Sequence, residues 1–150
     1  MRHKPRILFF STGDSARSQM AEGFTRELAG DEIVAVSTAV QSASADPLAG
    51  QVMNEVRVDI SAQRPKQVAD ALKEHFSYVV MVCDASQEKF PVWPFCRNII
   101  RWSVIDPERV DGNGENKREA FRSVRNEIRR KVQEMLRQIL PRIQEGLECR

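Results

Sequence analysis

Residues 7–24 read Ile-Leu-Phe-Phe-Ser-Thr-Gly-Asp-Ser-Ala-Arg-Ser-Gln-Met-Ala-Glu-Gly-Phe. The apolar run predicts a buried strand, and the small residues after it predict a loop that restarts as a helix at Arg17. The backbone N–H groups of such a loop and the positive end of the helix can surround an anion, and a guanidinium can bind two of its oxygens. We therefore expect an oxyanion-binding loop made of Ser11, Thr12, Gly13, Asp14, Ser15, Ala16 and Arg17.

Around this loop, strand-like apolar runs alternate with helix-like patterns, which is typical of an α/β fold with a parallel sheet. We predict strands at residues 6–10, 33–38, 78–82 and 98–102. We predict helices at residues 17–29, 47–56 (with Asp46 as N-cap), 65–74 and 117–145. The first helix has Met20, Ala21, Phe24 and Leu28 at helical spacing, and Gly30 should end it. The last helix should bury Phe121, Val124, Ile128, Val132, Met135 and Ile139, and Pro141 should kink or end its final part.

The composition favours one globular domain over residues 1–150, because the chain has 150 residues and 41% apolar content. The apolar runs are short, so we expect no membrane span and a cytoplasmic protein. The three cysteines (Cys83, Cys96 and Cys149) match neither a zinc site nor a disulfide framework, and we predict no metal site and no cofactor. The net charge is +2, and the basic residues of the last third alternate with Glu119, Glu127 and Glu134. This pattern favours a solvated helix face over a nucleic-acid site.

The loop lacks the Gly-Lys-Ser/Thr of nucleotide-binding loops, which argues against a nucleoside triphosphate as ligand. Its sequence Ser-Thr-Gly-x-Ser-Ala-Arg-Ser-Gln-Met-Ala-Glu instead resembles the Cys-x5-Arg-Ser loop of the low-molecular-weight protein tyrosine phosphatases. Within them it is most similar to the arsenate reductases that share their fold. Residues 46–49, 58–61 and 80–84 also resemble family segments, so the match extends from about residue 6 to about residue 130. The resemblance implies a three-layer α/β/α sandwich with a four-stranded parallel sheet.

The resemblance also implies roles for single residues. Ser11 stands where the family has its nucleophilic cysteine, and Ser18 follows the oxyanion-clamping Arg17. Asp106 matches the general acid, and Cys83 matches a second redox cysteine. Phe90 occupies the place of a third cysteine. Cys96 is either its substitute or, like Cys83, a buried structural thiol.

A serine hydroxyl is far less acidic than a thiol, and serine carries no redox chemistry. We therefore expect a protein that binds phosphate, sulfate or arsenate but is catalytically impaired. With cysteine at position 11 it would be an arsenate reductase first and a phosphotyrosine phosphatase second. Its partners would be a small oxyanion or a phosphorylated substrate, with thioredoxin or a small thiol as reductant. The alternative is a non-enzymatic phosphate-sensing or phosphoprotein-binding regulator.

Asp14 stands where the family loop typically has asparagine. In some of the reductases that asparagine helps to hold a potassium ion, with partners that fall at Glu22 and Ser37 of this sequence. Lys66 lies near the position of a further ligand. The resemblance therefore raises the hypothesis that the Lys66 ammonium replaces the ion. Neither histidine, His3 or His75, is expected to assist Ser11, because both should lie at the surface.

Overall fold

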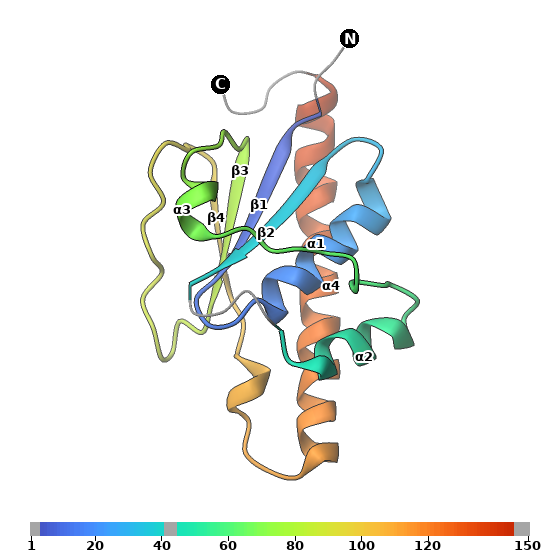
Figure 1. The fold of residues 1–150 in the computed structure, drawn as a ribbon. Coiled ribbons are helices and arrows are strands. Elements are labelled where there is room, and N and C mark those ends of the chain that lie inside the picture. The colour runs from blue at the N-terminus through green and yellow to red at the C-terminus, as the bar shows by residue number, and fades with distance from the viewer. Residues whose placement is uncertain (1–3, 41–44, 146–150) are drawn as a thin grey trace.

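The computed structural model describes residues 4–40 and 45–145. In this part of the chain four strands form one parallel sheet in the order β2-β1-β3-β4. The strands are β1 (Arg6–Ser11), β2 (Val34–Ala39), β3 (Tyr78–Cys83) and β4 (Ile99–Ser103), each within one residue of the prediction at either end. Because all four are parallel, their carboxyl ends lie together at the lower side of the sheet in Figure 1. At this edge Ser11 is paired with Ala39 and Val82, and Cys83 with Ser103.

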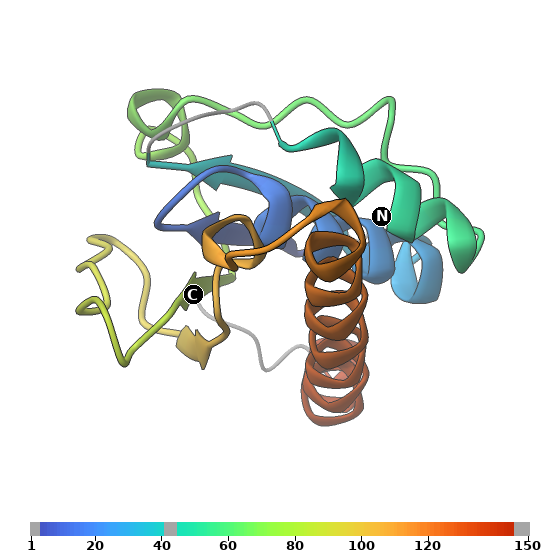
Figure 2. The same ribbon diagram turned by 90° about the horizontal axis from the view of Figure 1, so that it is seen from below.

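Helices cover the two faces of the sheet unequally (Figures 1 and 2). One face packs against α1 (Ala16–Ala29), α2 (Pro47–Glu55) and α4 (Gly114–Gln144). The other is covered by the short helix α3 (Val68–Ala71) and by the segment 84–98. Strand residues alternate between the two cores, so that Ile7 and Phe9 face the larger one and Leu8 and Phe10 the smaller one. Burial on both faces explains the continuous apolar runs of β1 and β3.

The long helix α4 is the main cover of the larger core. All six of its predicted core residues are buried. Asn113 caps its start by accepting a hydrogen bond from Asn116 N, and Pro141 lies inside its last part. In α1, Leu28 lies within the helix, as its spacing indicated, but it is not part of the core. Its side chain is 49% exposed and lines a surface hollow together with Leu136 and Leu140 of α4.

The helix predicted at residues 65–74 is much shorter in the structure, where α3 contains only Val68–Ala71. The backbone of Lys66 is bound to the end of β2: its N–H donates to Ser37 O, and its carbonyl accepts from Thr38 Oγ1. This extended pairing prevents a helix from starting before residue 67. Gly30 does end α1, but in a right-handed conformation. The reason for glycine there is close approach, since a Cβ would lie 2.5 Å from Arg26 O.

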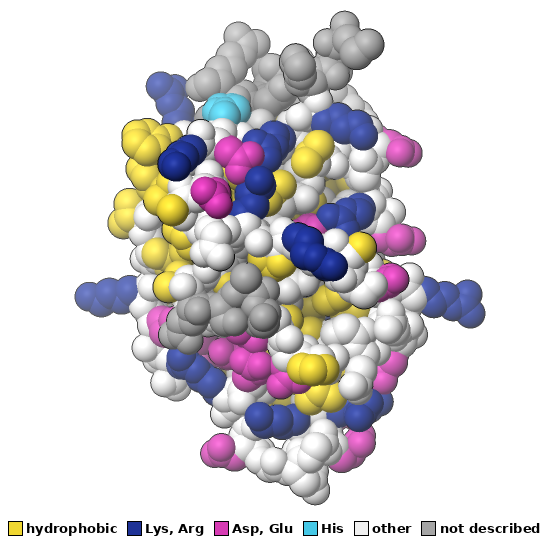
Figure 3. Space-filling view, in the orientation of Figure 1, with side chains coloured by type: hydrophobic (Ala, Val, Ile, Leu, Met, Phe, Trp, Pro, Cys, Tyr) yellow, Lys and Arg dark blue, Asp and Glu magenta, His cyan; other side chains and the backbone are white. Residues whose placement is uncertain are grey.

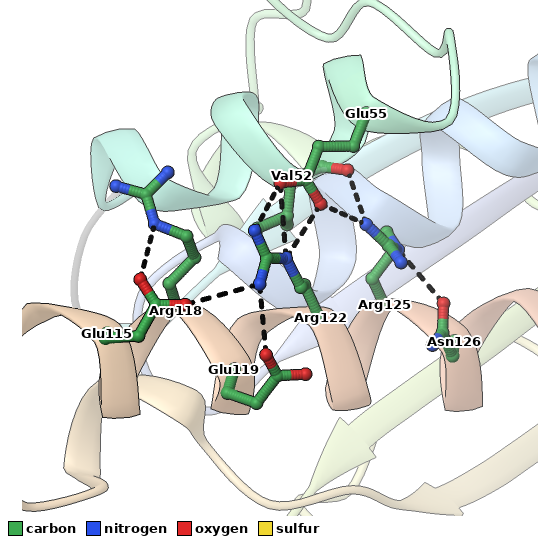
Figure 4. Close-up of polar contacts among 8 residues, drawn as sticks. All are labelled: Val52, Glu55, Glu115, Arg118, Glu119, Arg122, Arg125 and Asn126. Carbon is green, nitrogen blue, oxygen red and sulfur yellow. Dashed lines mark hydrogen bonds and ion pairs between the residues drawn. The ribbon is translucent and has the colours of Figure 1, made fainter.

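Charged side chains join α2 to α4 (Figure 4). Glu55 of α2 accepts hydrogen bonds from Arg122 and Arg125 of α4, and Arg125 also donates to Val52 O. The hydrogen bonds from Arg122 are the largest cause that lowers the pKa of Glu55 to about 2. Further along α4, Lys131 pairs with Glu127 and Arg137 with Glu134, as expected for a solvated face. In the described residues, no helix combines the length and the apolar character that crossing a membrane requires.

Candidate oxyanion site

Hydrogen bonds fix the loop that follows β1, both to the neighbouring strand and to the start of α1. Thr12 N donates to Val82 O of the neighbouring strand, and Asp14 Oδ1 accepts a hydrogen bond from Ala16 N. Such a side-chain contact to the backbone two residues on fixes a turn at the start of α1. All residues from 11 to 17 are buried. The predicted loop therefore lies at the carboxyl edge of the sheet and leads directly into the helix N-terminus.

Ser11 is completely buried at the end of β1. Its Oγ lies 2.8 Å from Asp14 O and 2.9 Å from Ser18 Oγ, and Ser18 Oγ lies 3.1 Å from Ser15 O. The carbonyl can only accept, so the Ser11 hydroxyl donates its proton to Asp14 O. None of these neighbours is a base that could remove that proton.

Arg17 is also completely buried. Its Nη1 donates to Val104 O at 2.9 Å, which holds the guanidinium against the chain that follows β4. Among the described residues, its Nε and Nη2 atoms have no hydrogen-bond partner. Buried donors are almost always paired in folded proteins, so these two nitrogens mark a place where an acceptor is required.

Asp106 lies across from the loop, just before the short 3-10 helix η1 (Pro107–Arg109). Its Oδ1 accepts from Glu108 N, and its Oδ2 is 3.7 Å from Arg17 Nη2. A Cβ on Gly13 would lie 2.9 Å from Asp106 Oδ2 and 3.2 Å from Arg17 Nη2, so only glycine fits there without displacing them. The structure thus brings together Ser11, Arg17, Ser18 and Asp106 from segments almost 90 residues apart in the sequence.

Glu108 adds a third carboxylate that the sequence reasoning missed. Ligand oxygens of Asp14, Asp106 and Glu108 all lie within 4.8 Å of one another. Burial is the main cause that raises the pKa of Glu108 to about 7, and the carboxylates of Asp14, Asp106 and Asp46 add to it. Figure 3 shows acidic side chains gathered on this face, at the level of η1. The only sequence signal was the spacing of two residues between Asp106 and Glu108.

A chain of hydrogen bonds supports the loop from behind. Gln19 Nε2 donates to Ser15 Oγ, Gln63 Nε2 donates to Gln19 O, and Arg26 Nη1 donates to Gln63 Oε1. Arg26 also pairs with Glu22, which accepts from Ser37 Oγ at 2.7 Å. Burial raises the pKa of Glu22 despite these partners. The roles of Gln19, Gln63 and Arg26 were not predicted, because they join segments whose proximity the sequence does not reveal.

The hypothesis for Lys66 was wrong. Glu22 and Ser37 do meet, but Lys66 Nζ lies 3.0 Å from Glu74 Oε2, and the cation that contacts Glu22 is Arg26. The backbone of Lys66 is held at the end of β2, and from there its side chain forms an ion pair with Glu74. His75 is exposed, as expected, whereas His3 and Cys149 lie outside the described residues.

The two described cysteines lie at opposite ends of β3. Cys83 is its last residue and is buried, and burial is the main cause that raises the pKa of its thiol. Its carbonyl accepts from Val104 N, next to the Arg17 contact. Cys96 Sγ lies 3.4 Å from Phe76 O and 3.8 Å from Ser77 O, before β3 begins. The structure therefore places Cys83 near the site and Cys96 far from it.

The chain is similar to known proteins over most of its length. A family model described as low molecular weight phosphotyrosine protein phosphatase matches residues 6–145. The arsenate reductase of Halalkalibacterium halodurans is 33% identical over 130 residues, which are 87% of this chain and 94% of that protein. The glutaredoxin arsenate reductase of a Synechocystis species is 29% identical over 134 residues, 89% of this chain and 98% of that protein.

Solved structures confirm the fold. A structure described as an arsenate reductase in the phosphate binding state has a TM-score of 0.75 at 27% identity, and the match covers 90% of this chain and 98% of that one. It therefore bears out the predicted four-stranded parallel α/β fold. Since the family model extends over nearly all of the described residues, this chain belongs to the low molecular weight phosphotyrosine protein phosphatase family.

Proposed function

We propose that this protein binds phosphate-like oxyanions at residues 11–17 and that serine at position 11 leaves it catalytically impaired. Arg17 supports oxyanion binding most directly, because it is a buried cation whose Nε and Nη2 have no hydrogen-bond partner among the described residues. Charge-assisted hydrogen bonds from a guanidinium to an oxyanion are among the strongest in proteins. One structural relative, described as an arsenate reductase in the phosphate binding state, is consistent with this ligand class.

Impairment follows from the surroundings of Ser11. A cysteine in an anion-binding loop becomes a thiolate because its pKa falls from about 8.5 by several units. A serine hydroxyl starts far higher, and the neighbours of Ser11 Oγ are a carbonyl and a hydroxyl rather than a base. Attack by Ser11 on phosphorus or arsenic should therefore be very slow.

The activity that the site would have with a nucleophile is best considered for a variant with cysteine at position 11. With cysteine at position 11, we propose arsenate reduction first and phosphotyrosine hydrolysis second, because curated relatives are arsenate reductases. The reductant would be thioredoxin, glutaredoxin or a small thiol, in line with the glutaredoxin arsenate reductase among those relatives. The reducing environment this needs agrees with the cytoplasmic location expected from the sequence.

A second candidate function is non-enzymatic sensing of phosphate or binding of a phosphorylated protein. The buried Ser11 hydroxyl without a base favours it, since the loop then holds an anion without attacking it. Turnover separates the two proposals: an impaired enzyme retains slow hydrolysis of an aryl phosphate that Ser11→Ala abolishes, whereas a binding protein shows binding without turnover.

Calorimetric titration with phosphate and with arsenate tests oxyanion binding. Arg17→Ala should weaken binding by about 1.5–3 kcal/mol, the scale of a hydrogen bond to a charged group. Arg64→Ala is the matched control, because it removes the same charge from an exposed side chain that donates to the nearby carbonyls of Ser61 and Gln63. Equal affinities in the unsubstituted protein and Arg17→Ala would refute the proposed role of the loop.

A further inference from the structure

Three carboxylates lie together at the site: Asp14 of the loop, and Asp106 and Glu108 of the segment after β4. The proposed function gives no role to Glu108. Two of the three, Asp14 and Asp106, are buried, with exposed fractions of 8% and 7%. Asp106 is the only one near cations, and those contacts are long: 3.7 Å to Arg17 Nη2 and 3.8 Å to Arg109 Nε. In the described part of the chain, no lysine or arginine forms an ion pair with Asp14 or Glu108.

Asp14 supplies a second, separate observation. Its Oδ1 is satisfied by Ala16 N, which fixes the orientation of the carboxylate. Its Oδ2 is buried and has no partner among the fixed hydrogen-bond donors of the described residues, although a protonated Glu108 carboxyl could share its proton with Asp14. A buried carboxyl oxygen held in this way is costly unless a cation or a proton donor meets it. The Asp14 carboxyl group that carries this oxygen also has an oxygen within 4.8 Å of the carboxylate oxygens of Asp106 and Glu108.

We propose that Asp14, Asp106 and Glu108 bind one divalent cation of about the size of Ca²⁺. The donors are all carboxylate oxygens, the ligands that hard divalent cations prefer. Two oxygens on opposite sides of a Ca²⁺ ion, each at about 2.3–2.6 Å, are at most about 4.6–5.2 Å apart. The separations within this group, all 4.8 Å or less, fit that limit. Mg²⁺, with bonds of about 2.0–2.1 Å, sets a tighter limit of about 4.0–4.2 Å.

The cation would change the chemistry of the neighbouring loop. Coordination keeps Asp106 ionised, so it could not serve as a general acid while the ion is bound. The ion would also offset the negative charge next to Arg17. The next expectation rests on the proposed function. If the loop binds an oxyanion, the cation and the oxyanion should each raise the protein's affinity for the other by the same factor.

Calorimetric titration of the metal-free protein with CaCl₂ in phosphate-free buffer measures cation binding independently of oxyanion binding. We expect saturable binding of one Ca²⁺ per chain and a higher melting temperature in its presence. Asp14→Asn and Glu108→Gln should each weaken binding by about tenfold or more, because even outer-sphere substitutions at metal sites cost about 10- to 100-fold. Glu134→Gln, an equal charge change on the exposed side of α4, should leave the affinity unchanged.

Asp14→Asn retains the oxygen that accepts from Ala16 N, so this variant should fold. The proposal is overturned if the unsubstituted protein shows no saturable Ca²⁺ binding up to millimolar concentration. It is also overturned if Asp14→Asn binds as tightly as Glu134→Gln. Failure of phosphate to bind would refute the proposed function and leave this calcium result intact, so the two failures are distinguishable.

Discussion

Replacing Ser11 with cysteine should restore hydrolysis of phosphate esters but not an internal disulfide relay. Ser11→Cys returns a nucleophile to a loop whose helix N-terminus and Arg17 favour a thiolate. Hydrolysis of an activated aryl phosphate should therefore rise by orders of magnitude. Arsenate reduction also requires that the sulfur–arsenic bond be passed on to a second thiol and then resolved. The positions of Cys83 and Cys96 decide whether this chain can do that alone.

The length of β3 separates Cys83 from Cys96 and so opposes a disulfide between them. Cys96 lies beside Ser77, and Cys83 is six residues further along an extended chain, about 20 Å away at about 3.3 Å per residue. A disulfide requires Cα atoms about 4.4–6.8 Å apart. Moving Cys96 would displace Trp93, which is 8% exposed and packs on Phe10 with ring centroids 5.5 Å apart. Loss of a packed Trp side chain typically costs about 3–5 kcal/mol.

The assay compares Ser11→Cys with the same protein carrying Cys96→Ser or Cys83→Ser. Aryl phosphate turnover should be equal in Ser11→Cys and in the variant that adds Cys96→Ser. Arsenate reduction should be slow in both and should depend on added small thiol. Non-reducing peptide mapping after arsenate turnover gives the disulfide directly. A Cys83–Cys96 bond in that map, or loss of arsenate reduction with Cys96→Ser, would show that the segment 84–98 rearranges and that the distance argument is wrong.

In the Ser11→Cys background, Asp106→Asn should slow hydrolysis of a substrate with a poor leaving group by about 100- to 10,000-fold, and that of a good leaving group much less. Steady-state rates with both substrates check this, and equal modest losses would indicate a structural role. The pKa of Glu55 is lowered from 4.5 to about 2, so its stabilisation is complete above pH 4.5 and is lost as the pH falls toward 2. Urea unfolding should accordingly show Glu55→Gln less stable than the unsubstituted protein at pH 7 and equal to it near pH 2. Ile128→Ala removes a fully buried side chain of α4 and should lower the free energy of unfolding by about 2–5 kcal/mol, and an equal urea midpoint would contradict that packing.

The sequence by itself determined the strands, the long helix and the loop before Arg17. These features depend on local patterns: continuous apolar runs for strands buried on both faces, a helical stripe in α4, and small residues before a helix start. The parallel order of the strands then required their carboxyl ends to meet, which placed Ser11 and Cys83 at one edge. The resemblance of the loop to a known family added Asp106, and the structure brought that residue to the loop.

Only the tertiary structure decided which partners the polar side chains found. Lys66 pairs with Glu74 rather than Glu22 because β2 holds its backbone, and the same pairing shortens α3. Cys96 lies at the far end of β3 because the segment 84–98 returns along the sheet before β4. Asp14 and Glu108 meet although 93 residues lie between them in the chain. Contacts of this kind depend on how separate elements pack, and no local pattern of apolar and polar residues encodes that distance.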